Sequence, residues 1–129
     1  MNKFYVTTTI PYVNAEPHIG FALEIVAADV IARYQALQNN EVIFNTGTDE
    51  HGLKIYQQAQ EEKLDPQTYV DRNAAKFMAL KDLLNLSYTN FIRTTDPGHV
   101  KAAQEFWRRC DKQGDIYKKT VSIELAISE

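Results

Sequence analysis

A β-rich run that leads through a short loop into a long helix is the feature that most constrains the fold of this chain. The run extends from about Phe4 to Ile10, a Pro-Tyr-Asn loop follows, and the helix starts at His18. The first turn of a helix presents unpaired N–H groups and the positive end of the helix macrodipole, so phosphate binds there without a cationic side chain. His18 adds a donor at this point, and Gly20 lets a flat base or sugar approach the backbone. This order of strand, loop and helix N-terminus predicts a nucleotide site in a parallel α/β sheet.

The rest of the chain continues to alternate helices and strands, which predicts a parallel sheet. The first helix is expected to end near Gln38, because Asn39 and Asn40 tolerate the left-handed cap conformation. Two Asp-Pro pairs predict later helix starts, because Asp caps a helix and Pro fits its first position. The elements expected after the first helix are a strand at Val42–Asn45, a helix from Gly52, a helix over Pro66–Leu84, a strand at Asn90–Arg93, a helix from Asp96 to Gln113 that stops at Gly114, and a strand-like stretch over Ile116–Ile127.

The apolar residues of the first helix recur with a period of about 3.6, as expected of an amphipathic helix. They are Ile19, Leu23, Val26, Ala27, Val30, Ile31, Tyr34 and Leu37. Glu24, Asp29 and Arg33 are spaced for contacts along the helix, so we interpret them as surface ion pairs and not as a metal site.

Two short motifs indicate a family that this chain resembles. His18-Ile19-Gly20-Phe21 resembles the His-x-Gly-His signature of class I aminoacyl-tRNA synthetases, with Phe21 in place of the second His. The run Thr46–Gly52, T-G-T-D-E-H-G, resembles the segment found at this place in methionyl-tRNA synthetases of the bacterial type. Leucyl, isoleucyl and valyl enzymes are similar in the first motif but differ in the second. The resemblance covers about residues 3 to 119, and it also includes Ala28-Asp29-Val30, Ala32-Arg33-Tyr34 and Phe91–Thr95.

The resemblance implies the fold and the reaction. The fold would be α/β, a Rossmann-like parallel sheet of which residues 1–114 form the N-terminal half, and residues 115–129 would begin a connecting insertion with a divergent tail. The reaction would be the activation of methionine by ATP, bound with Mg²⁺, to methionyl-adenylate, followed by transfer to tRNA. Contacts to tRNA would lie mostly in regions absent from this chain. The tail after Thr120 is either divergent family sequence or sequence from another reading frame, and we favour the second because the resemblance stops abruptly.

The resemblance also assigns site residues, each beside a purely structural interpretation. His18 and Gly20 would be the catalytic positions and, with Phe21, would bind ATP; the structural alternative is a helix start. Asp49 would pair with the substrate ammonium at the end of the second strand, where α/β sheets place ligands, or else would cap the next helix. Phe21 is expected to be an apolar support for Tyr12 or Leu23. The residues expected to line the methionine pocket are Ile10, Pro11, Tyr12 and Asp49.

Other conspicuous residues are interpreted as structural. Glu50 and His51 are expected to be loop and cap residues and not acid–base catalysts, and His99 is expected to lie on the surface. Phe106 and Trp107 are expected in the core of the last helix. Cys110 is interpreted as a buried small side chain, and a single cysteine excludes both a disulfide framework and a cysteine-rich zinc knuckle.

Net charge and the lengths of the apolar runs bear on whether this chain binds nucleic acid or a membrane. A net charge of −3 supplies no basic field for nucleic acid, which argues against this segment alone holding a tRNA. The sequence contains no apolar run long enough to span a bilayer and no secretory leader, so we expect a cytoplasmic protein without membrane contact.

Two rival functions stay open. The first is a catalytically silent nucleotide-binding half-fold that needs a complementary chain, such as the missing C-terminal half, because the family's Lys-Met-Ser-Lys-Ser motif is absent and Lys118-Lys119 stands alone. The second is another adenylate-forming nucleotidyltransferase of the same fold, against which the Asp49 segment argues. We therefore expect a methionine–tRNA ligase segment that is inactive as the isolated chain.

Overall fold

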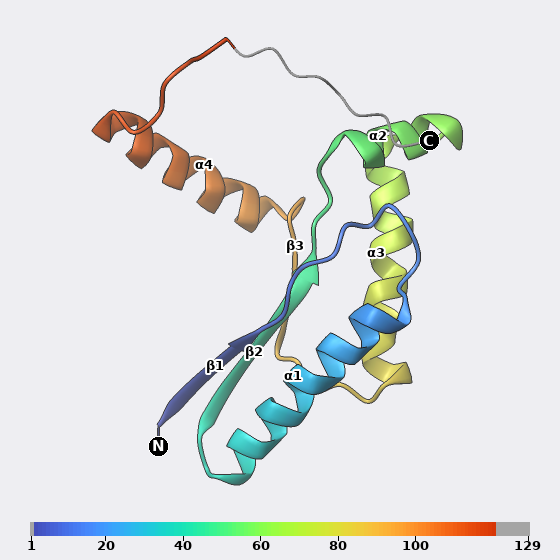
Figure 1. Cartoon of the computed structure of the whole chain (residues 1–129), viewed down its shortest axis with the longest axis vertical. Coiled ribbons are helices and arrows are strands. Elements are labelled where there is room, and N and C mark those ends of the chain that lie inside the picture. The colour runs from blue at the N-terminus through green and yellow to red at the C-terminus, as the bar shows by residue number, and fades with distance from the viewer. Residues whose placement is uncertain (1, 121–129) are drawn as a thin grey trace.

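The computed structural model describes residues 2–120, which form an α/β arrangement of seven elements (Figure 1). The helix and strand types match the sequence-based expectations. In chain order the elements are β1 (Lys3–Thr7), α1 (Ile19–Leu37), β2 (Glu41–Thr48), α2 (Leu53–Glu61), α3 (Pro66–Leu83), β3 (Asn90–Arg93) and α4 (Pro97–Gln113).

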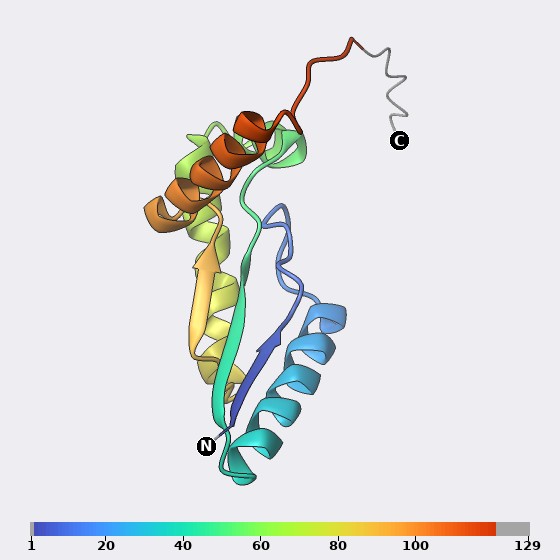
Figure 2. The same ribbon diagram turned by 90° about the vertical axis from the view of Figure 1, so that its left-hand side faces the viewer.

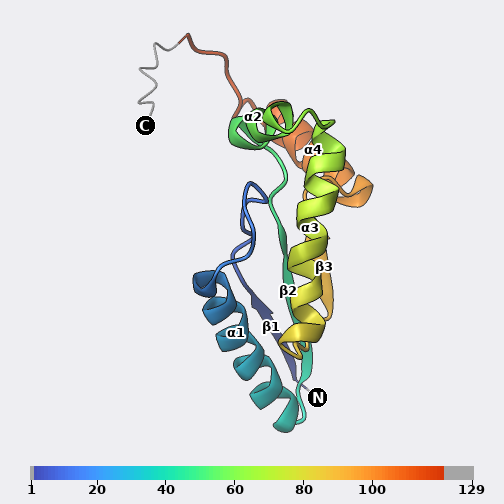
Figure 3. The same cartoon turned by 90° about the vertical axis from the view of Figure 1, so that its right-hand side faces the viewer.

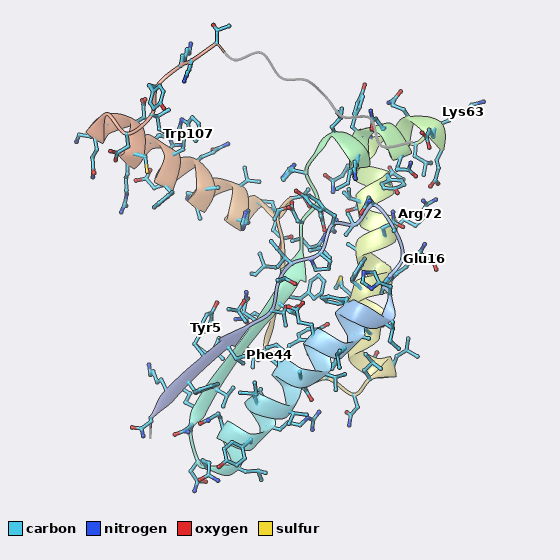
Figure 4. All side chains as sticks on the ribbon, in the orientation of Figure 1. Tyr5, Glu16, Phe44, Lys63, Arg72 and Trp107 are labelled. Carbon is cyan, nitrogen blue, oxygen red and sulfur yellow. The ribbon has the colours of Figure 1, made fainter. Side chains whose placement is uncertain are left out.

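The three strands form a parallel sheet in the order β1-β2-β3. Parallel crossovers are right-handed, so two successive crossovers in the same direction place α1 and α3 on one face of the sheet (Figures 1 and 2). Phe44 points to that face and is fully buried, whereas Tyr5 points to the opposite face and is 61% exposed (Figure 4). Within residues 2–120 the sheet is therefore covered on one face only. The predicted parallel α/β fold is confirmed.

The core lies between the covered face of the sheet and the two long helices (Figure 3). Phe21 of α1 meets Phe77 of α3 edge to face, with ring centroids 5.4 Å apart and ring planes at 70°. Ile25 and Ala32 continue the buried stripe of α1 toward its C-terminus. Phe21 is therefore an apolar core residue of α1, and the partner that the structure shows for its ring is Phe77 of α3.

The buried stripe of α1 differs from the apolar series that periodicity singled out. That series is largely exposed: Ile19, Leu23, Val30 and Leu37 are at least 61% accessible. The buried residues are Phe21, Ile25, Ala28, Asp29 and Ala32, which are also spaced three or four apart. Because α1 is apolar almost all round, helical periodicity does not select which stripe meets the sheet.

Asp29 corrects a second expectation for α1. It does pair with Arg33, Nε to Oδ2 at 2.6 Å, but it is only 6% exposed and is not a surface group. Its Oδ1 accepts from the amide of Ser87 at 2.5 Å and from the Ser87 hydroxyl at 2.6 Å. Burial alone would raise the pKa of Asp29, but the hydrogen bonds from Ser87 and Arg33 outweigh it and lower that pKa. The carboxylate thus ties α1 to the loop before β3.

Element boundaries agree closely with expectation for the helices and less closely for the strands. Asp65 caps α3 by accepting from the amides of Gln67 and Thr68, and Gly114 ends α4 with φ of 81°. β1 stops at Thr7 instead of Ile10, and β2 continues to Thr48 instead of Asn45. Residues 115–120 form no strand, so the strand-like stretch expected from Ile116 is wrong there, and its remainder lies outside the described residues.

α4 stands apart from the sheet and has no buried residue (Figure 1). The expectation that Phe106 and Trp107 are core residues is wrong for residues 2–120, since they are 71% and 63% exposed. Cys110 is half-buried instead of buried, and His99 is exposed as expected. Among the described residues, no helix is long and apolar enough to cross a membrane.

Phe21→Ala tests the observed buried face of α1. Truncating this buried ring should lower the free energy of unfolding by about 3–5 kcal/mol. Leu23→Ala is the matched control, because Leu23 is 72% exposed on the same helix, and we expect a change within about 0.5 kcal/mol. Urea titration of both variants measures the difference, and equal losses would contradict this packing.

Candidate active site

The candidate site lies where the carboxyl ends of β1 and β2 meet. Past the end of the sheet, the Asp49 amide donates to the Pro11 carbonyl at 2.9 Å, and the Val13 amide donates to the Asp49 carbonyl at 3.3 Å. These bonds form a parallel bridge between Tyr12 and Asp49. Three of the residues predicted for the methionine pocket, Pro11, Tyr12 and Asp49, are thus brought together.

The loop between β1 and α1 is held from both sides. Thr9 donates its amide to Glu24 Oε1 at 2.6 Å and its hydroxyl to the same atom at 2.8 Å, which ends β1 early and turns the chain toward α1. On the other side, Asn73 of α3 donates to the Val13 carbonyl at 3.0 Å, and the Tyr69 hydroxyl donates to the Asn14 carbonyl at 3.2 Å. Glu24 is therefore a loop anchor and not a partner in a helix-surface ion pair.

Two cavities flank the Tyr12 side chain, which is 59% exposed. One, of about 410 Å³, opens toward the start of α2 and is lined in part by Asn14, His51 and Gly52. The other, of about 270 Å³, lies toward α1 and α3 and is lined in part by Pro11 and His18. Tyr12 lines both cavities, whereas Ile10, which is 38% exposed, lines neither.

His18 caps α1 with its imidazole. Nδ1 accepts from the Gly20 amide at 3.1 Å, and a neutral imidazole that accepts at Nδ1 carries its proton on Nε2. A Cβ on residue 20 would lie 2.9 Å from Cε1 of His18 and 3.0 Å from Nδ1. Gly20 thus leaves room for the capping ring itself, a role that the sequence pattern did not reveal. The exposed ring keeps Nε2 free to donate to a ligand.

The first turn of α1 offers backbone donors beside His18. The Gly20 amide donates to His18 Nδ1, and the Ala22 amide donates to the His18 carbonyl. Within residues 2–120, the amides of Ile19 and Phe21 have no hydrogen-bond partner. Because the Phe21 ring is buried, only its amide is available to an anion, so its predicted contact with ATP is restricted to the backbone.

Glu50 lies next to Asp49 in a buried, fully bonded cluster. Its Oε1 accepts from Arg93 Nε at 2.7 Å and from the Thr48 hydroxyl at 2.7 Å, and its Oε2 accepts from Arg93 Nη2 at 2.8 Å and from the Thr95 hydroxyl. Burial alone would raise the pKa of Glu50, but these hydrogen bonds and the Arg93 charge lower it. Glu50 thus lies in the loop between β2 and α2, as expected, but it caps no helix and is a buried structural anion.

Arg93 at the end of β3 pairs with a second carboxylate as well. Its Nη2 lies 2.6 Å from Asp71 Oδ1 on α3, and the hydrogen bonds that Arg93 donates to Glu50 and Asp71 raise its pKa. His51 is exposed, with Nε2 3.2 Å from the Thr94 carbonyl, as expected of a loop residue. Within the described part of the chain, no group of three or more His, Cys, Asp or Glu side chains is arranged to hold a metal ion.

Comparison with known proteins identifies the family. The family model for class I tRNA synthetases (M) matches residues 4–128. The chain belongs to this family. Its relatives include the methionine–tRNA ligase of Rhizobium meliloti, 50% identical over 117 residues, and that of Thermotoga maritima, 50% identical over 116 residues. These matches cover 91% and 90% of the chain but only 23% and 18% of the two ligases, so the chain spans about a quarter or less of the relatives it matches.

Two solved structures of tRNA synthetases share the fold. Mycobacterium tuberculosis methionyl-tRNA synthetase in complex with methionyl-adenylate superposes with a TM-score of 0.88 at 47% identity, over 91% of this chain and 23% of that chain. A leucyl enzyme from Agrobacterium radiobacter, in a complex with tRNA and LeuAMS, gives a TM-score of 0.83 at 25% identity, over 90% of this chain and 15% of that chain. The fold is therefore that of class I synthetase catalytic domains.

Sequence reasoning missed two residues that build the site. No local signal marks Arg93, because its partner Glu50 lies 43 residues away in the chain. Gly47 lies inside β2, where a Cβ would come within 2.0 Å of the Ile92 carbonyl oxygen on β3. A glycine within a strand is the available signal, since it marks close backbone approach.

Gly20→Ala tests the capping geometry, and Gly98→Ala is its matched control because each glycine is the second residue of its helix. An added Cβ meets the His18 ring at residue 20 and nothing within 4 Å at residue 98. Losing the His18 cap should make Gly20→Ala less stable than Gly98→Ala by about 0.5–2 kcal/mol. Denaturant titrations measure the stabilities, and NMR of the His18 ring nitrogens reports the lost bond. Equal effects of both substitutions would contradict this geometry.

The lowered pKa of Glu50 predicts a pH dependence of stability. An ionised Glu50 stabilises the fold above its unfolded pKa of about 4.3, and this contribution is lost as the pH falls through the lower folded pKa. At pH 7, Glu50→Gln should therefore have a lower free energy of unfolding than the parent. Between about pH 5 and 3, it should lose less of that free energy than the parent does. Glu105→Gln should change the slope much less, because solvent screens the two exposed arginine pairs that lower the pKa of Glu105. Urea titrations at stepped pH measure these slopes, and identical slopes for Glu50→Gln and the parent would contradict the ionised state.

Proposed function

We propose that this chain is the segment of a methionine–tRNA ligase that binds methionine and the ATP phosphates. The complete protein would activate methionine with ATP to methionyl-adenylate and transfer it to tRNA, in the cytoplasm. The observation that carries the proposal is the Tyr12–Asp49 bridge beside the helix N-terminus capped by His18, in a chain of this family. Relatives named methionine–tRNA ligase and a neighbour bound to methionyl-adenylate support it.

Methionine would bind beside the Tyr12–Asp49 bridge. The half-buried Asp49 carboxylate faces the ammonium, and the exposed Tyr12 ring covers the thioether chain, where a sulfur–aromatic contact contributes about 0.3–1.5 kcal/mol. Pro11 lines the cavity on the α1 side of Tyr12, and Ile10, which lines neither cavity, precedes it in the chain. The charge around this place suits a cation, because Glu50, Asp71 and Asp49 together carry three carboxylates against the single guanidinium of Arg93.

ATP would bind at the start of α1. Nε2 of His18 donates to the phosphates, the free amides of the first turn and the helix dipole stabilise the charge, and Gly20 keeps the His18 ring in place. The methionine carboxylate attacks the α-phosphate and pyrophosphate leaves, a step that needs positioning and charge stabilisation and no proton abstraction. Mg²⁺ accompanies the phosphates as their counterion.

The remaining length of the ligase would complete the site. The uncovered face of the sheet and the outer stripe of α1, with Leu23, Val30 and Leu37, are apolar surfaces of the kind that interfaces cover. The same surfaces favour one alternative function, a silent nucleotide-binding half-fold that needs a complementary chain. Pyrophosphate exchange decides between them, measured after this chain is joined to the remaining segment of the Rhizobium meliloti ligase. A ligase segment should then give methionine-dependent exchange, whereas a silent half-fold should give no exchange. The chain alone, as the control, should give none in either case.

Asp49→Asn in this completed enzyme tests the methionine site. Loss of a charge-assisted hydrogen bond of about 1.5–3 kcal/mol should raise the methionine KM about 10- to 150-fold and leave the ATP KM unchanged. Steady-state pyrophosphate exchange measures both constants. A normal methionine KM with weakened ATP binding would overturn the assignment of Asp49 to the ammonium; capping of α2 is no alternative, because its N-cap is Gly52 without a side-chain bond.

His18→Ala is the complementary variant in the same enzyme. Removing a donor that acts on the developing phosphate charge should lower kcat by about 10²- to 10³-fold with little change in methionine affinity. Equal losses in rate and in methionine affinity would show that His18 holds the fold and not the phosphates.

A further inference from the structure

Burial alternates along the segment that carries Asp49. Thr48 is fully buried, Asp49 is half-buried, Glu50 is 4% exposed, and His51 is exposed. Successive side chains of an extended chain point to opposite sides, so the side that takes Glu50 also decides where Asp49 points. With Glu50 turned inward, Asp49 and His51 are turned toward the open side of the site.

Glu50 is held inward by its carboxylate and by its backbone amide. Its two carboxylate oxygens accept four hydrogen bonds, from Thr48, from Thr95 and from two nitrogens of Arg93. Its amide donates to the Thr94 hydroxyl at 2.8 Å. A bidentate guanidinium–carboxylate pair fixes direction as well as distance, so both the side chain and the backbone of residue 50 are locked to the turn after β3.

Arg93 is itself fixed, so the lock extends beyond β3. Its guanidinium reaches Asp71 on α3, and its amide donates to Asp96 Oδ2 at 3.0 Å at the start of α4. Its side chain is 22% exposed and pairs with two carboxylates, which leaves it no free charge to offer a phosphate. Arg93 therefore holds the segment that carries Asp49 in place, through Glu50, and is not a phosphate ligand.

Stability alone does not account for this ion pair. Replacing a buried ion pair by well-packed apolar side chains is often neutral or stabilising, so the presence of this pair is weak evidence for a stabilising role. We infer that Glu50 is a positioning residue, which with Arg93 holds Asp49 directed at the substrate ammonium. The inference rests on the proposed function, in which Asp49 binds that ammonium. Glu50 would then act on methionine affinity without touching methionine.

Glu50→Gln in the completed enzyme tests this role. The amide keeps the size of the side chain but loses the charge and one acceptor for Arg93, so Asp49 should lose its fixed direction. We expect the methionine KM to rise at least tenfold while the ATP KM stays within twofold. Arg93→Lys, which keeps the charge and loses the bidentate geometry, should raise the methionine KM in the same direction.

Asp29→Asn is the matched control, because Asp29 is an equally buried carboxylate that also pairs with an arginine and a hydroxyl. It anchors α1 to the loop before β3 and should leave the methionine KM within twofold. An equal rise in both variants would overturn positioning in favour of a general loss of stability. A Glu50→Gln enzyme with a normal methionine KM would also overturn it, while a raised KM in Asp49→Asn would leave the proposed function standing. A normal methionine KM in both Glu50→Gln and Asp49→Asn would overturn the inference and the proposed function together.

A milder variant and a structural readout keep the test decisive if Glu50→Gln folds poorly. Thr95→Ala removes one hydrogen bond to Glu50 and no charge, and it should raise the methionine KM by a smaller factor. In the 129-residue chain, NMR should show the amides of Asp49 and His51 shifted or broadened in Thr95→Ala but unchanged in Asp29→Asn. Unperturbed amides in Thr95→Ala with an unchanged KM would overturn the inference.

Discussion

The pair of backbone hydrogen bonds that Asp49 exchanges with Pro11 and Val13 is the interaction on which the site depends. β1 and β2 pair in register from Lys3 with Glu41 to Thr7 with Asn45, and the Tyr12–Asp49 bridge resumes that pairing after an irregular loop. Without it, the loop after β1 would have no fixed relation to the end of β2. With it, an aromatic ring, a carboxylate and the start of α1 occupy one end of the sheet.

Electrostatics divides this end of the sheet into two regions. At the start of α1, free amides, the positive end of the helix dipole and His18 favour an anion. At the end of β2, Asp49 lies above a cluster with one more carboxylate than guanidinium, which favours a cation. In the proposed function, the ammonium of an amino acid and the phosphates of a nucleotide would carry these two charges.

The elements were predictable because caps, Asp-Pro pairs and strand ends are local signals. That Pro11, Tyr12 and Asp49 lie together was implied by the family resemblance. The sequence did not predict which stripe of α1 is buried, since a helix that is apolar all round, with Phe21 and Leu23 both candidates, is oriented only by what it packs against. Nor did it predict the inward Glu50, because the pairing of Glu50 with Arg93 joins residues 43 apart in the chain. Phe106 and Trp107 look like core residues by type, but their helix has no buried residue within residues 2–120.

Phe21 connects the departure from the family's signature to the packing of the fold. Its ring is 5% exposed and meets Phe77 edge to face, so this position in α1 belongs to the core that joins α1 to α3. An imidazole here would place a polar ring among apolar neighbours, at a cost of about 1–3 kcal/mol unless it found a partner. The apolar residue therefore favours stability over one further phosphate donor. It leaves the anion-binding end of the site to His18 and the backbone amides that His18 organises.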